Sequence, residues 1–340
     1  IYSCSDEFLD ETQNYNIDSE NFFNSEEDYY LALVGAYDLL QASYVNVLLG
    51  EIASDNTLCG GESATDVVGF QQIDDMGHTE VNSNLRDIWS WMFAGVSRTN
   101  YFLENQNKTA FDGRDAMVAE ARFLRAYYHF ELVKWFGGIP IKNYEAALAG
   151  AGERFVPGDE LSIPRSSVAE VYALIESDLI YAVNNLEYTA PQVGRVTKGA
   201  AEALLGKAYL YQNKFTEAAT VLDNVINNGP YDLALDYATI FESGGENNVE
   251  SVFEVQYTDA EGAGFGCLQC SEGNVAVGFN GIRNYSGPTF DSGYSFNVPT
   301  QEAVDAFETG DSRKDVSILD IEAWATTTQA TFGVGYEHTG

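Results

Sequence analysis

Carboxylates are the commonest side chains in this sequence that could do covalent chemistry. The 340 residues include 52 Asp and Glu. Two carboxylates about 5–10 Å apart, one of them with a raised pKa, are what a glycoside hydrolase needs. No motif singles out such a pair, and the sequence contains no G-x-S-x-G serine motif, no H-E-x-x-H zinc motif and no G-x-x-x-x-G-K-[S/T] phosphate loop. We therefore predict that the protein is not an enzyme, and a glycoside hydrolase is the weakest alternative.

Thiol and imidazole side chains give no clear cofactor or metal site. Cys267 and Cys270 form a C-x-x-C, but they lie in a glycine-rich loop and not at the start of a helix in a βαβ unit. We expect a local disulfide or two free thiols there. The sequence has no second C-x-x-C, no two His at metal-binding spacing and no calcium-loop motif. We predict no cofactor and no metal ion.

The charge balance excludes several classes of partner. The 52 acidic residues face 17 Lys and Arg, which gives a net charge of −35. A field of this sign repels nucleic acid and the surface of an anionic membrane. No run of about 20 apolar residues predicts a membrane-spanning helix. Attachment to a membrane would therefore depend on a lipid anchor only.

The elements that must position any site are mainly helices in the first two thirds of the chain. Helical spacing of apolar residues predicts helices over Glu26–Leu49, Leu85–Asn105 and Met117–Phe136, and a fourth that follows a cap at Ser166 or Ser167. An internal repeat supports paired helices, because Ala119–Tyr127 matches a second copy 82 residues later. That copy continues with tetratricopeptide spacing, which lies at Gly206, Tyr209, Ala218, Leu222 and Pro230.

Two parts of the chain lack helical spacing. Residues 50–84 are rich in Gly, Asp, Ser and Thr and are predicted to form a long functional loop. After residue 235 loops dominate, although Asn248–Tyr257 has the alternation of an extended strand. We predict a mostly α fold with tetratricopeptide-like helix pairs over residues 26–235, including a loop insertion at about 50–84. An irregular, loop-rich part with short strands follows over residues 236–340.

The N-terminus has the pattern of a lipid-attachment signal. Ile1 and the small residue Ser3 precede Cys4, as at the end of a bacterial lipobox. The acidic pair Asp6-Glu7 resembles the surface-export signal of Bacteroidetes lipoproteins. We predict that Cys4 carries a lipid and that the segment up to residue 25 is a lipoprotein leader.

Several segments together resemble the SusD/RagB family. They occur in order along the chain at Cys4–Asp10, Trp89–Asn100, Glu120–Pro140, Pro164–Ser167, Gly194–Ala201 and Pro299–Glu308. The resemblance implies tetratricopeptide-like helix pairs that cradle a more irregular part. It also implies a lipid-anchored protein on the cell-surface side of the outer membrane, which captures a polysaccharide for a TonB-dependent, SusC-like transporter without catalysis. Family members usually continue well beyond the last of these segments, so we expect a truncated C-terminus.

A different class of function would use the helices alone. Tetratricopeptide repeats commonly bind peptides in a concave groove. The alternative is therefore a protein-interaction scaffold that binds no sugar. The two hypotheses differ over whether the loops bind a glycan.

Glycan binding calls for exposed aromatic rings that stack on the C–H faces of sugars, and for polar groups that bond the hydroxyls. Loops on a rigid scaffold can aim such side chains. Two loop regions supply candidates, at Asp55, Asn56, Asn280, Arg283, Tyr285, Tyr294 and Trp324. The net charge favours a neutral polysaccharide or oligosaccharide such as a glucan, mannan or xylan, although a local patch at Arg283 would admit an acidic one.

Overall fold

The computed structural model describes residues 22–141, 163–258, 268–269, 273, 275–287 and 289–326. The main helices, in chain order, are α1 (Glu26–Tyr37), α2 (Ser43–Ile52), α3 (Val68–Asp74), α4 (Ser83–Glu104), α5 (Arg114–Phe136), α7 (Val168–Asn185), α8 (Lys198–Tyr211) and α9 (Phe215–Asn228). The shorter elements are η2 (Asp38–Ala42), η4 (Tyr237–Thr239), η5 (Ser243–Gly245), α10 (Ala276–Asn280), α11 (Gln301–Asp305), α12 (Lys314–Ser317), α13 (Ile321–Trp324) and the strands β1 (Thr57–Leu58) and β2 (Val298–Pro299). The prediction of a mostly α fold with short strands is confirmed.

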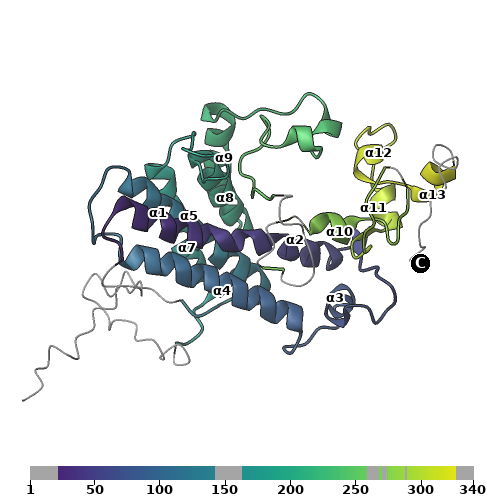
Figure 1. The fold of residues 1–340 in the computed structure, drawn as a ribbon, viewed down its shortest axis with the longest axis horizontal. Helices are drawn as coiled ribbons and strands as arrows, with labels where there is room; N and C mark the ends of the chain where they lie inside the picture. Colours follow the sequence, from purple (N-terminus) through teal and green to yellow (C-terminus); the bar gives the residue numbers. More distant parts are fainter. Residues whose placement is uncertain are drawn as a thin grey trace, which may run out of the picture.

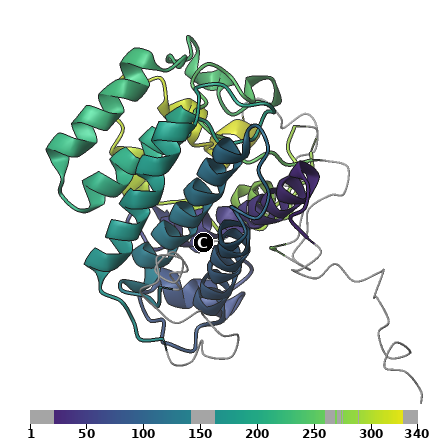
Figure 2. The same ribbon diagram turned by 90° about the vertical axis from the view of Figure 1, so that its left-hand side faces the viewer.

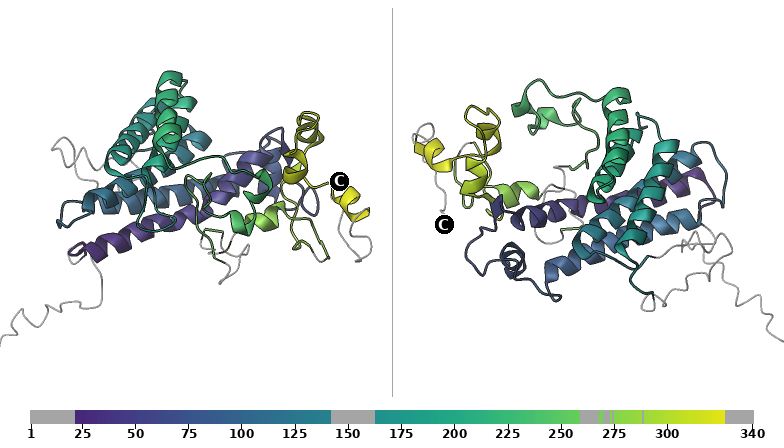
Figure 3. Two further views of the ribbon diagram at one scale, coloured as in Figure 1. Left: turned by 90° about the horizontal axis from the view of Figure 1, so that it is seen from above. Right: turned by 180° about the vertical axis from the view of Figure 1, so that it is seen from behind.

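From α4 to α9, each long helix packs against the next one along the chain. The pairs α4–α5, α5–α7, α7–α8 and α8–α9 form a continuous stack, and α1 lies against α4 and α5 (Figure 1). Figure 2 shows the stack as a row of helices coloured from blue to green. Helix α1 is followed directly by η2 and then by α2. Helix α2 extends away from the stack and reaches the loop-rich part near α10 (Figure 3). The succession α1–η2–α2 therefore connects the helical stack to the loop-rich part.

Capping residues explain where these helices begin and end. Ser167 caps α7, because its hydroxyl accepts the Glu170 N–H while the Glu170 carboxylate accepts the Ser167 N–H at 2.8 Å. The reciprocal capping box confirms the helix start predicted at this serine pair. Helix α5 ends at Gly137, whose φ of 69° is one that glycine adopts readily.

The tetratricopeptide spacing corresponds to a close helix crossing. A Cβ atom added at Gly206 of α8 would lie 2.5 Å from Leu222 Cδ2 of α9, so a larger residue has no room there. The same feature recurs where α4 meets α5, since a Cβ at Gly95 would lie 2.6 Å from the ring of Tyr128. Small residues at the crossings therefore set the spacing of the stack.

A buried ion network joins the three central helices. Asp178 of α7 is completely buried and accepts hydrogen bonds from Arg125 Nε and Nη2, both at 2.7 Å, and from Arg122 Nη1 at 2.9 Å. Arg125, on α5, is 1% exposed and also donates to Asn100 Oδ1 of α4 at 3.2 Å. The paired charges compensate one another inside the core.

Two local predictions were wrong. Residues 50–84 are more than a loop, because they contain β1 and α3, whose Phe70 and Ile73 enter the core. The alternating run Asn248–Tyr257 forms no strand in the described chain. Its Phe253 and Tyr257 side chains instead pack against the helices, and the Tyr257 hydroxyl donates to the Gln41 carbonyl at 2.8 Å.

The region Glu26–Ile52 is long and apolar enough, by length and composition alone, to cross a membrane. It is interrupted by η2, and 56% of its most apolar window is buried inside the fold. Tyr29, Leu33 and Leu49 belong to the hydrophobic core. Its apolar character is therefore accounted for by packing within the protein.

Candidate functional site

The two strands fasten the first predicted loop region to the chain near residue 300. Strands β1 and β2 are antiparallel, with Thr57 opposite Pro299. The buried Thr300 donates from its hydroxyl to the Asp55 carbonyl and from its backbone N–H to the Asn56 carbonyl, each at 2.9 Å. These hydrogen bonds use the backbone carbonyls of Asp55 and Asn56 and leave their side chains unengaged by Thr300. Both residues are exposed.

A second set of contacts brings Asn280 to the same end of α2. Asn280 is the last residue of α10 and is exposed, and its Oδ1 accepts a hydrogen bond from Asn297 Nδ2 at 2.8 Å. The same Asn297 amide also donates to the Glu51 carboxylate, in the last turn of α2. Residues from early and late parts of the described chain thus meet beside α2. Asn297 was not among the predicted residues, and no local pattern distinguishes it.

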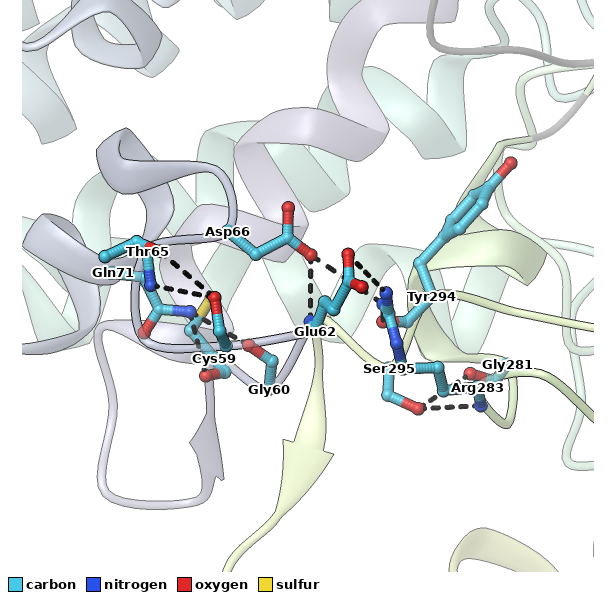
Figure 4. A network of polar contacts seen from close by, with 11 residues as sticks. Cys59, Gly60, Glu62, Thr65, Asp66, Gln71, Gly281, Arg283, Tyr294 and Ser295 are labelled. Carbon is cyan, nitrogen blue, oxygen red and sulfur yellow. Dashed lines mark hydrogen bonds and ion pairs between the residues drawn. The ribbon is translucent and has the colours of Figure 1, made fainter. Parts of the chain in front are cut away.

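Arg283 lies behind this surface, and acceptors surround it. Its side chain is 13% exposed, with Nη2 3.5 Å from a Glu62 carboxylate oxygen and Nη1 3.7 Å from an Asp66 carboxylate oxygen. Nη1 also donates to the Tyr294 carbonyl at 3.2 Å. Figure 4 shows the guanidinium turned toward Glu62. The local basic patch considered from the sequence is therefore neutralised, and Arg283 holds two loops together.

Tyr294 is an aromatic ring that is both supported and accessible. A Cβ atom added at Gly278 would lie 2.4 Å from its ring, so the ring rests directly on the backbone of α10. The rings of Phe279 and Phe296 lie 6.5 Å and 6.3 Å from it, centroid to centroid. The residue is nevertheless 36% exposed. Such a ring is held firmly enough to act as a stacking platform.

A second aromatic group surrounds Trp324. Its ring lies 5.1 Å from Phe290 and 6.3 Å from Tyr285, centroid to centroid. Trp324 is half-buried and Phe290 is 38% exposed, whereas Tyr285 is only 5% exposed. The expectation that Tyr285 is an exposed platform was wrong, because its ring packs beneath the other two. Phe290, which was not selected from the sequence, occupies the accessible position.

The thiol of Cys59, which lies near this surface, is shielded from ionisation by burial. Burial, with smaller contributions from Asp74, Asp66 and Asp75, raises the pKa of Cys59 to about 12, so the reactive thiolate is scarce at neutral pH. Cys4, Cys267 and Cys270 lie outside the described residues. Within the described ranges no group of three His, Cys, Asp or Glu side chains is placed to hold a metal ion.

Comparisons with known proteins identify relatives of the whole arrangement. A family model described as "SusD-like: starch-binding associating with outer membrane" matches residues 7–210. The SusD-like protein P25 of Formosa agariphila is 24% identical over 280 residues, which cover 76% of this chain and 50% of that protein. The chain thus spans about half the length of the curated relatives it matches first.

Solved structures give the same grouping. A laminarin-binding SusD-like protein is 30% identical, with a TM-score of 0.82 over 93% of this chain and 70% of that one. Surface glycan-binding protein A from Bacteroides fluxus is 26% identical, with a TM-score of 0.77 over 92% of this chain and 66% of its own. The resemblance inferred from the sequence is confirmed. Because the family model matches more than half of its residues, this chain belongs to the SusD-like family.

Proposed function

We propose that this protein binds a polysaccharide and passes it on, without cleaving it. The observation that carries the proposal is that the exposed residues Asp55, Asn56 and Asn280 lie beside the end of α2, next to the accessible Tyr294 ring on α10. We assign to the same surface the half-buried Trp324, which packs against Phe290 in the chain that follows α10. We call this region the glycan-binding surface and define it by Asp55, Asn56, Asn280, Tyr294 and Trp324. Tyr285 and Arg283 support it from behind.

The chemistry of these side chains suits a sugar. The rings of Tyr294 and Trp324 offer flat apolar faces for C–H groups, and the amides of Asn56 and Asn280 can both donate to and accept from hydroxyls. The Asp55 carboxylate adds a strong acceptor. Laminarin, the glycan named for the solved relative that is 30% identical, is the first ligand to test.

The described part of the chain also has cavities away from this surface. A cavity of about 360 Å³ is bordered by Tyr30, Tyr37 and Phe253, with Gln192 and Arg195 at its edge. We favour the open surface beside α2 over this cavity, because a polymer must lie across its site and leave at both ends. A protein-interaction scaffold would instead use such a cavity on the helical side, and this remains the second candidate.

The proposed setting is the outer surface of the outer membrane. The family description, which associates its members with the outer membrane, supports that location. A lipid on Cys4 would anchor the protein, and a TonB-dependent, SusC-like transporter would receive the glycan. In this arrangement residues 26–235 act as the helical scaffold and residues 236–340 contribute most of the glycan-binding surface. A Cys4→Ala precursor expressed in a Bacteroidetes host should leave the membrane fraction; its retention there would refute the anchor.

Isothermal titration with soluble laminarin, mannan and xylan tests the binding proposal. Trp324→Ala and Tyr294→Ala should each weaken binding of the preferred glycan about tenfold, equivalent to roughly 1.4 kcal/mol. Tyr211→Ala is the matched control, because Tyr211 is 54% exposed on α8, in the helical stack. Equal losses in all three variants, or no binding by the wild type, would overturn the proposal. Release of reducing sugar from a bound glycan would indicate the hydrolase instead.

A further inference from the structure

Two carboxylates lie against the guanidinium behind the glycan-binding surface. Glu62 and Asp66 approach Arg283 Nη2 and Nη1 at 3.5 Å and 3.7 Å. The loop that carries them is fixed in place, because Asp66 Oδ2 accepts the Glu62 N–H at 2.9 Å and Gln71 Nε2 donates to the Gly60 carbonyl at 2.9 Å. The arrangement in Figure 4 is therefore a built feature of this loop.

The exposure of these groups decides which charge a ligand meets. The Glu62 side chain is 74% exposed and that of Asp66 is 28% exposed, whereas Arg283 is only 13% exposed. The accessible charge is negative, although a cation lies beneath it. Asp55, on the same surface, adds another exposed carboxylate.

We propose that Glu62 and Asp66 make the glycan-binding surface selective for uncharged glycans and reject sulfated or uronic-acid polymers. The inference rests on the proposed function of that surface. Two like charges about 8 Å apart in water repel enough to change an affinity roughly twofold, so removal of both carboxylate charges should change the affinity for one sulfate about fivefold. The Arg283 charge is the same before and after this change, and in the wild type it offsets part of the repulsion. A polymer with several sulfates is rejected more strongly.

Selectivity of this kind has a signature that steric exclusion lacks. Repulsion between exposed charges is screened by salt, with a Debye length of about 10 Å at 0.1 M and about 3 Å at 1 M. Discrimination between a neutral and a charged form of one glycan should therefore weaken as salt is added. A site that rejected the sulfate group by its size would discriminate equally in all salt concentrations.

The experiment compares laminarin with chemically sulfated laminarin, which share one backbone. The readout is the ratio of the two dissociation constants, measured by titration at about 20 mM and about 500 mM NaCl. We expect sulfated laminarin to bind the wild type at least about tenfold more weakly at low salt, and the ratio to fall about fivefold in Glu62→Gln/Asp66→Asn. Glu62→Gln alone, which changes a mostly exposed side chain, should lower the ratio about twofold and does not depend on the Asp66 contacts.

The control variant removes the same charge elsewhere. Glu26→Gln/Glu27→Gln neutralises two exposed carboxylates in the first turn of α1, in the helical stack, and should leave the ratio unchanged. An unchanged ratio in both Glu62 variants, or an equal fall in the control, overturns the inference alone. Failure of the wild type to bind any neutral glycan overturns the proposed function, and the inference with it.

Discussion

Replacing Asp178 by asparagine should destabilise the helical stack by about 3–5 kcal/mol, the usual cost of removing one partner from a buried ion pair. Asp178 is 0% exposed and accepts three hydrogen bonds from Arg122 and Arg125. Asparagine keeps one acceptor oxygen but no charge, and its amide group would face the guanidinium groups. Arg125 is 1% exposed, so its guanidinium would stay buried after it loses the charge of Asp178.

The second arginine keeps part of its environment. Arg122 lies 4.5 Å from the centre of the Tyr181 ring and is 12% exposed, so some of its charge is compensated after the substitution. This places the expected loss near the lower end, at about 3 kcal/mol.

Urea unfolding followed by circular dichroism measures the loss. With a denaturant slope of about 3 kcal/mol per molar, the midpoint should fall by roughly 1 M. Asp115→Asn is the matched control, because Asp115 forms an exposed pair with Arg114 at 3.1 Å that should contribute about 0–1 kcal/mol. If both variants unfold at the same urea concentration, the buried network contributes no more than a surface pair and the reasoning fails.

Three further predictions concern the surroundings of single residues. Gly278→Ala should lower glycan affinity without unfolding the protein, because the new Cβ would lie 2.4 Å from the Tyr294 ring; titration and thermal melting together check this. Burial lowers the pKa of His129 to about 4, so the unfolded chain binds a proton at a higher pH than the folded one does. Stability should fall by up to about 3 kcal/mol as the pH drops from about 6.5 to 4, and His129→Gln should remove that part of the pH dependence of urea unfolding. Gly206→Ala should cost about 1–3 kcal/mol through overpacking against α9. By contrast, a Cβ atom added at Gly35 has no atom within 4 Å, so Gly35→Ala should stabilise α1 by about 0.5–1 kcal/mol. Coinciding melting curves of the Gly206→Ala and Gly35→Ala variants would contradict both expectations.

The helices could be predicted because their signals are local. At the start of α7, Ser167 and Glu170 are three residues apart, and at the end of α5 Gly137 lies three residues before a proline. Each signal therefore lies within about one helical turn of the helix end that it marks. Helix α3 escaped prediction because it is short and buries only Phe70 and Ile73, which is too little for a periodic pattern.

The candidate surface could be predicted only in part, because its contacts are not local. Asp55 and Asn280 were selected for their residue types, and the structure brings their loops to one end of α2. The sequence does not reveal which aromatic ring of a loop turns inward: Tyr285 is buried, whereas Phe290 is exposed. The carboxylates that neutralise Arg283 lie more than 200 residues away, and no spacing rule connects them.

The pairing of β1 with β2 also joins two segments that are synthesised at very different times. Thr57 of β1 pairs with Pro299 of β2, which follows about 240 residues later in the chain. At a synthesis rate of about 5–20 residues per second, that partner emerges roughly 12–48 seconds after the strand it completes. The helical stack has no such delay, because neighbours along its chain are neighbours in space. The stack can therefore form from contacts between neighbouring helices, whereas the proposed glycan-binding surface is complete only after β1 and β2 pair.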